Sequence, residues 1–243
     1  MKKVMHITLA IASFAFIVLL DACKKEDNSG IASKDQSQNS IARNDNASLI
    51  FPTQAHMSGK TYTEWASEWW KWNLQFDCSH FPLSDVNGSR QNQNQSGTVF
   101  FLSGRRGNTL SVTVPHDATL FFPLITYYAD SRTTGTGVEQ SLTNDVTSTV
   151  DLMDGLSLTI DGISITNLSD YKLVTPMFMY AGNADLANCY DSDITGNAEP
   201  FVAGGYFVML KSLSPGQHTI HRVGGASALF PFLFDITYNI TAL

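Results

Sequence analysis

The first strongly patterned segment, residues 59–76, repeats its apolar residues at helical spacing and contains all four tryptophans. At 100° per residue the large side chains fall on one side of a helix. Trp65, Trp69, Trp72 and Phe76 form a central stripe, flanked by Ala66, Trp70 and Leu74. Thr61 followed by Glu64 is a capping-box signature, so the helix is expected to begin there. We interpret the tryptophans as core anchors, because aromatic residues at this spacing are usually buried.

From Gly97 onward the apolar period changes to two, which is typical of strands. Strands are predicted at residues 98–102, 110–114, 120–125, 156–160, 163–165, 172–174, 205–210, 217–223 and 232–240. Pro123 cannot donate to a ladder, so it must lie at an edge or a bulge. Asp161-Gly162 between two alternating runs predicts a two-residue hairpin. Residues 132–149 are rich in Thr, Ser and Gly, and predict either a long loop or a poorly formed helix around residues 138–146.

Many short strands and one aromatic helix predict a mainly β fold. We expect an antiparallel β-sandwich or jelly-roll-like domain, with the N-terminal Trp-rich amphipathic helix covering a sheet face or one open end. Residues 49–243 are long enough for a single domain with a sizeable core, and they contain no second linker.

Residues 1–22 are predicted to be a lipoprotein signal peptide. Lys2 and Lys3 precede an apolar run, residues 7–20, that is too short for a stable membrane span. The run ends in Leu20-Asp21-Ala22-Cys23, which resembles the lipobox of bacterial lipoproteins. Cys23 is then the lipid attachment site and the contact with the membrane. Asp21 departs from the small or neutral residue usual at its position.

The segment after Cys23 predicts where the protein is displayed. Lys24-Lys25-Glu26-Asp27 resembles the surface-export signal of lipoproteins in Bacteroidetes-type bacteria, although an ordinary charged linker has a similar composition. We expect a surface-exposed lipoprotein of the cell outer membrane, with the periplasmic face as the alternative. Residues 23–48 are polar and predict a disordered tether.

Charge and cysteine content narrow the possible partners. The chain has 15 basic and 22 acidic residues, a formal net charge of −7, and no basic patch. This balance argues against binding nucleic acid or an anionic membrane surface. With Cys23 assigned to lipid, Cys78 and Cys189 remain in an oxidising compartment and predict a disulfide.

Candidate chemistry is sparse, and the catalytic residues are unknown at this point. No nucleophile elbow, phosphate-cradling loop or nucleotide fingerprint is present. Glu64 and Glu68, one helical turn apart, or Glu64 with Asp85, are the carboxylates that a hydrolase would use as acid and base. This hypothesis requires Glu64 or Glu68 to line a concave pocket with a raised pKa.

No metal or cofactor is expected, apart from an incomplete calcium motif. Asp191, Asp193 and Thr195 alternate ahead of Gly196 as calcium ligands do, but Val202 stands where a twelve-residue loop requires Glu. The alternative is an Asx-rich surface turn. The six histidines are scattered, and His218 and His221 should point to opposite faces of a strand, so no zinc site is indicated.

The chain resembles a family of uncharacterised secreted bacterial proteins with a W-x-x-E-W-W-x-W helix motif. The matching positions are Gly59, Tyr62, Trp65, Glu68, Trp69, Trp70, Trp72, Pro82, Leu83, Asp85, Gly88, Gln95, Gly97, residues 99–102, Gly104 and residues 114–115, 121–123, 205–210 and 213–221. His116-Asp117 departs from the family pattern of a small residue and glycine. The resemblance implies export and a β-rich domain, and it carries over no activity.

These features predict a non-enzymatic, lipid-anchored binding module for a glycan, peptide or protein. Binding is expected through loops at one end of the sheet pair, and the polar loop at residues 91–95 is one of the features that support this expectation. Two alternatives stay open: an extracytoplasmic hydrolase using Glu64, Glu68 or Asp85, and a structural component of the cell envelope.

Overall fold

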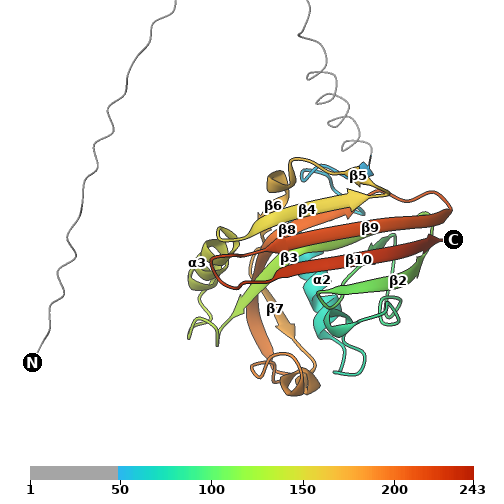
Figure 1. The fold of residues 1–243 in the computed structure, drawn as a ribbon. Helices are drawn as coiled ribbons and strands as arrows, with labels where there is room; N and C mark the ends of the chain where they lie inside the picture. Colours follow the sequence, from blue (N-terminus) through green and yellow to red (C-terminus); the bar gives the residue numbers. More distant parts are fainter. Residues whose placement is uncertain (1–48) are drawn as a thin grey trace, which may run out of the picture.

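The computed structural model describes residues 49–243, which form two packed sheets and a covering helix. In Figure 1, strands β9 and β10 lie in front of β3 and β8, and helix α2 (Tyr62–Leu74) lies behind these. The predicted signal peptide, the lipid site Cys23 and the tether lie outside the described residues. No helix within residues 49–243 is long and apolar enough to cross a membrane.

The first sheet has the order β1-β3-β8-β6, and β7 also pairs with β8. Its strands are β1 (Val99–Phe101), β3 (Thr119–Asp130), β6 (Lys172–Val174), β7 (Phe178–Ala181) and β8 (Ala198–Leu210). β1 runs parallel to β3, and the other pairs are antiparallel.

The second sheet has the order β2-β10-β9-β4-β5. Its strands are β2 (Asn108–Val114), β4 (Asp154–Ile160), β5 (Ile163–Ser164), β9 (Gly216–Gly225) and β10 (Leu233–Ala242). β2 runs parallel to β10. The predicted mainly β, sandwich-like fold is confirmed, but both sheets are mixed rather than purely antiparallel.

Short helices connect or cover these strands. They are α3 (Glu139–Val150) and the 3₁₀ helices η1 (Pro82–Ser84), η2 (Leu168–Tyr171) and η3 (Ala184–Asn188). Of the two alternatives for residues 132–149, the helix is the one observed. Leu142, Val146 and Val150 are fully buried on it. A Cβ at Gly204 of β8 would lie 2.7 Å from Val146, so this glycine permits the close packing of α3.

Two hydrophobic cores share the central strands β3 and β8, because successive strand residues point to opposite faces. Phe122 and Val208 face the second sheet. Phe121 and Phe207 face α2, and their rings stack with centroids 5.5 Å apart. Trp69 of α2 is fully buried and meets Phe207 edge-on at 5.9 Å. Burial on both faces explains why the start of β3 reads as a continuous apolar run.

The Trp-rich helix forms as predicted. Its capping box is complete: the Glu64 N–H donates to Thr61 Oγ1 at 3.3 Å, and the Thr61 N–H donates to Glu64 Oε2 at 2.7 Å. Each indole N–H has an acceptor. Trp65 donates to the Met57 carbonyl, Trp69 to the Leu102 carbonyl and Trp72 to the Gln93 carbonyl. Trp70 donates to the Thr126 hydroxyl. Trp69, Trp70 and Trp72 are buried and Trp65 is partly buried against the same core, so the interpretation of core anchors is confirmed in full for the first three.

Two local predictions also hold. The β3–β8 register shifts between Pro123 and Ile125, so Pro123 lies at a bulge. At the β4–β5 hairpin, Asp161 and Gly162 have φ values of 51° and 79°, the paired positive angles that its two-residue turn requires.

Candidate functional site

A cavity lies on the side of the sandwich where both edge strands stop short. β1 pairs with β3 only as far as Phe121, and β2 begins opposite Ile236 of β10. From the next part of β3, Pro123, Ile125 and Thr126 line a cavity of about 520 Å³, together with Phe234 of β10. Because β1 stops and β2 begins at these points, room is left for a site between α2, the sheets and the neighbouring loops.

The cavity combines aromatic walls with arginine side chains. Its aromatic lining is Trp69, Trp70, Phe81, Tyr190 and Phe234. Its charged lining is Arg105, Arg106 and Arg222, and no Asp or Glu among residues 49–243 lines it. Three arginines without a carboxylate are notable in a chain with more acidic than basic residues. The lining therefore presents positive charge against apolar surface.

Arg222 is the most constrained of the three. It occupies an inward-facing position of β9 and is only 3% exposed. Its Nε donates to the Tyr238 hydroxyl at 3.0 Å, and its Nη1 donates to the Leu124 carbonyl, next to the bulge, at 2.9 Å. No acceptor for Nη2 and no ion-pair partner for the guanidinium exist among the described residues. Arginine is rarely buried without such a partner, because desolvating its charge costs free energy.

Arg105 and Arg106 lie on the loop that joins β1 to β2, and both are exposed. The Arg105 N–H donates to the Asp85 carbonyl at 2.8 Å, which fixes the loop backbone. The Arg106 guanidinium lies 3.9 Å from the centroid of the Phe232 ring, a cation–π distance. No carboxylate in the described part of the chain forms an ion pair with either side chain. Both cations are therefore free to meet an anion.

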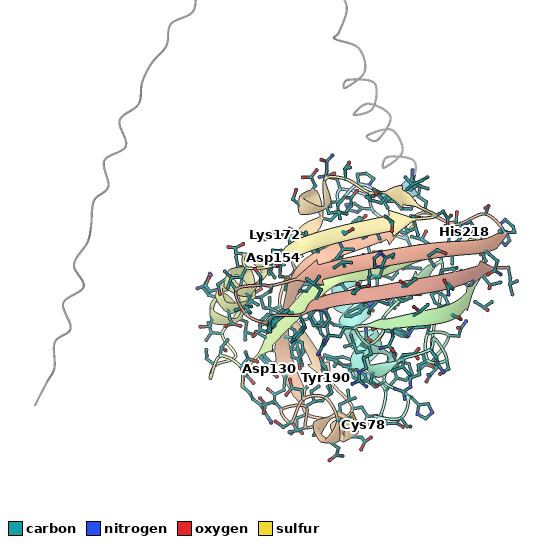
Figure 2. The ribbon with its side chains drawn as sticks, viewed as in Figure 1. Cys78, Asp130, Asp154, Lys172, Tyr190 and His218 are labelled. Atoms are coloured by element: carbon teal, nitrogen blue, oxygen red, sulfur yellow. A yellow bond between two sulfur atoms is a disulfide. The ribbon has the colours of Figure 1, made fainter. Side chains whose placement is uncertain are left out.

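A disulfide holds one wall of the cavity. Cys78 and Cys189 are bonded, with Cα atoms 6.0 Å apart, which confirms the predicted pairing. The neighbouring Tyr190 packs on Phe81 with ring centroids 4.7 Å apart. Figure 2 shows Cys78 and Tyr190 on the same side of the molecule. The covalent link therefore joins the two segments that supply Phe81 and Tyr190.

A buried polar network extends from the cavity to the loop after η1. The Tyr238 hydroxyl, which accepts from Arg222, donates to the Ser103 carbonyl at 2.8 Å. The Ser103 N–H donates to Gln91 Oε1 at 2.8 Å, and Gln91 Nε2 donates to Asp85 Oδ2 at 2.8 Å. The Asp85 carboxylate also accepts the backbone N–H groups of Asn87, Gly88 and Arg90 at 3.0–3.1 Å. Arg222 and Asp85 are therefore the ends of one connected network.

The carboxylates proposed for a hydrolase have structural partners. Glu64 is exposed, and its hydrogen bonds to the Thr61 N–H and hydroxyl lower its pKa. Glu68 forms ion pairs with Lys71 at 3.2 Å and Lys60 at 3.6 Å. Neither glutamate lines the arginine cavity. Asp85 is 1% exposed and saturated by four donors. The condition for the hydrolase, a glutamate in a pocket with a raised pKa, is not met by Glu64.

The polar loop at residues 91–95 is also used by the fold. Gln91 is fully buried in the network above. Gln95 accepts from the Phe101 N–H at 3.0 Å and donates to the Gln91 carbonyl at 2.6 Å. Gln95 thus attaches the loop to β1, Gln91 attaches it to Ser103 just beyond β1, and neither presents a free amide at the surface.

The calcium candidates already have partners within the chain. Asp191 accepts from the Tyr128 hydroxyl at 2.5 Å and from the Asp193 N–H at 3.0 Å. Arg132 pairs with Asp193 at 3.7 Å and donates to Thr195 at 3.4 Å. Between residues 49 and 243 no three His, Cys, Asp or Glu side chains lie close enough to hold one metal ion.

The sequence pattern does not predict the arginine cavity. A signal was present: Arg222 stands at an inward position between Ile220 and Gly224 of an alternating strand, where an apolar residue is expected. The pair Arg105-Arg106 between glycines marks a cationic loop tip. Only the fold shows that these two segments border one cavity.

Comparison with known proteins adds no functional assignment. No family model and no curated protein matches the chain. The solution structure of amebosin is similar at 13% identity, over 60% of this chain and 100% of that chain, with a TM-score of 0.17. So low a score carries no argument, and the resemblance to the secreted bacterial family stays a prediction.

Proposed function

We propose that this protein is a lipid-anchored extracytoplasmic binding protein that holds a small organic anion in the arginine cavity. Arg222 is the observation that carries the proposal. Its buried guanidinium lines the cavity and has no carboxylate partner in the described chain. A carboxylate, phosphate or sulfate group would supply the missing negative charge and accept the remaining N–H donors.

The cavity also suits the uncharged part of such a ligand. Its volume of about 520 Å³ falls within the range of small-molecule sites. Trp69, Trp70 and Phe81 offer flat apolar faces, while Arg105 and Arg106 at the mouth attract anions. An acidic sugar or a peptide carboxylate, from the ligand classes expected from sequence, has the required charge.

The proposed location rests on the sequence. The charged start, the apolar run and the lipobox ending in Cys23 support export and lipid attachment, and residues 24–27 favour display at the surface of the outer membrane. The hydrolase alternative lacks support from the geometry, because Glu64, Glu68 and Asp85 are engaged in a helix cap, surface ion pairs and a buried network.

Tryptophan fluorescence is a direct test, because Trp69 and Trp70 line the cavity. The chain from residue 23, with Cys23→Ser to prevent lipidation, is titrated with benzoate, hexanoate, phenyl phosphate and glucuronate. Each anion is compared with its neutral counterpart. We expect at least one anion to give a saturable change that its neutral counterpart does not give.

The variant Arg222→Met should weaken that binding at least tenfold, since the charged partner is lost. Arg132→Met is the matched control, because Arg132 pairs with Asp193 away from the cavity lining. Should Arg222→Met fail to fold, the exposed pair Arg105→Ala/Arg106→Ala takes its place, and a smaller loss of anion affinity is expected. A flat response to every anion, or equal binding by Arg222→Met and wild type, would overturn the proposal.

A further inference from the structure

A second cavity adjoins the arginine cavity and differs from it in chemistry. It has a volume of about 410 Å³. Ile125, Thr126 and Phe234 line both cavities, so the two spaces adjoin at these residues. The other lining residues are Tyr127, Thr149, Met153, Ala226, Leu229 and Phe230, and none of them is charged. Phe234 therefore borders one cavity lined by three arginines and a second cavity without a charged side chain.

The apolar surface continues outward along the loop between β9 and β10. Leu229, which lines the second cavity, is 50% exposed, and Leu233 at the start of β10 is 51% exposed. Phe230, Phe232 and Phe234 contact one another with ring centroids 4.5–5.8 Å apart. Arg106 lies over Phe232, so the cationic and apolar regions meet at this aromatic cluster.

From this arrangement we infer that the ligand is an amphipathic carboxylate with a long aliphatic tail, a fatty acid in chemical class. This inference rests on the proposed anion site. The carboxylate lies against Arg222, and the tail passes Phe234 into the second cavity. Burial of the tail there removes methylene groups from water, which is the main source of affinity for such a ligand. A compact anion such as phosphate reaches only the arginines of the first cavity and leaves the apolar one unused.

A chain-length series tests the inference. Butanoate, hexanoate, octanoate, decanoate and dodecanoate, each below its micelle concentration, are titrated into the Cys23→Ser chain by calorimetry. We expect the dissociation constant to fall by roughly threefold to fourfold per added methylene until the tail fills the second cavity. The neutral octanamide should bind at least tenfold more weakly than octanoate.

A filling variant locates the tail. Thr149 is half-buried on α3 and lines the second cavity, so Thr149→Phe should occupy it. This variant is expected to bind butanoate as wild type does and to lose the gain with chain length. The exposed neighbour Ser148→Phe is the matched control and should keep the gain.

The outcomes separate the two proposals. Anion binding without chain-length dependence overturns the fatty-acid inference and leaves the anion site standing. Chain-length dependence that survives in Thr149→Phe also overturns it, because the tail then lies elsewhere. A failure of all anions to bind overturns the anion site and this inference together.

Discussion

The Nε atom of Arg222 donates to the hydroxyl of Tyr238 at 3.0 Å, and through this contact the cavity is joined to the most buried polar groups of the protein. Both residues belong to the second sheet, on neighbouring strands. Burial raises the pKa of Tyr238, so its hydroxyl stays protonated and can donate to Ser103 while it accepts from Arg222. The orientation of the candidate ligand-binding guanidinium therefore depends on a tyrosine behind it.

Tyr238→Phe should destabilise the fold. The change removes the acceptor of Arg222 and the donor to the Ser103 carbonyl. The Arg222 Nε–H and the Ser103 carbonyl then stay buried without this hydrogen-bond partner. We expect the free energy of unfolding in urea to fall by about 1–3 kcal/mol. Tyr180→Phe is the control, because the Tyr180 hydroxyl makes no hydrogen bond within the described chain, and it should change stability by less than about 0.5 kcal/mol. Equal effects of the two variants would contradict a structural role for the network.

Asp85→Asn should be more damaging than an ordinary surface change. The amide keeps one acceptor oxygen but turns an N–H₂ group toward backbone donors that the carboxylate now satisfies. Hydrogen bonds to charged groups are the stronger class, so a loss of about 3 kcal/mol is expected in urea unfolding. Asp117→Asn, at an exposed position, is the control, and its free energy of unfolding should stay close to that of the wild type. A near-neutral Asp85→Asn would show that the network tolerates loss of its charge.

Removal of the disulfide should lower stability and loosen the Phe81–Tyr190 wall. Cys78 and Cys189 are 111 residues apart in sequence, so the bond strongly restricts the unfolded chain. On the loop-entropy model the double variant Cys78→Ser/Cys189→Ser loses about 5 kcal/mol. The loss is measured as the difference in free energy of unfolding in urea between the variant and the oxidised wild type. Two free thiols in the folded wild-type protein, found by non-reducing mass spectrometry, would refute the pairing itself.

Stability should depend on pH through His218, at the start of β9 (Figure 2). Its Nδ1 lies 2.6 Å from Asp161 Oδ2, and this hydrogen bond raises the pKa of His218. A raised pKa means that the folded state binds the proton more tightly. The stabilisation is therefore complete below the unfolded pKa of about 6.5 and is lost as pH rises through the folded value.

Asp161→Asn tests this pH dependence, because asparagine keeps the positive φ of the hairpin turn. The stability difference from wild type should be larger in acid than above the folded pKa, as measured by urea unfolding across that range. A difference that does not change with pH would mean that His218 is not protonated against Asp161.

The sequence predicts those elements whose pattern is local. The capping residues Thr61 and Glu64, the helical tryptophan stripe and the Asp161-Gly162 turn each specify their structure within a few residues. Strand β10 is similarly clear, because its inward residues alternate from Phe234 to Ala242. These elements form as predicted because local propensity and burial agree.

The elements that the sequence pattern did not predict depend on contacts with residues that are distant in sequence. The part of β8 that was not predicted, residues 198–204, contains Pro200 and Gly204, which are typical strand breakers. In the fold, Gly205 has a φ of 149°, and a Cβ there would lie 2.3 Å from the Ile125 carbonyl oxygen. The close approach of β3 at its bulge thus requires the glycine. Likewise, the parallel pairing of β2 with β10 joins residues more than 100 positions apart and leaves no local signal.

The short edge strands also affect how separate molecules meet. Beyond Phe121, no second strand of the described residues borders β3 on the β1 side, and an open strand edge can recruit a strand from another molecule. Pro123 offers no N–H to such a strand, the bulge breaks the regular spacing, and the Leu124 carbonyl already accepts from Arg222. The residues that open the cavity therefore also leave this unpaired edge few free backbone groups for a strand from another molecule.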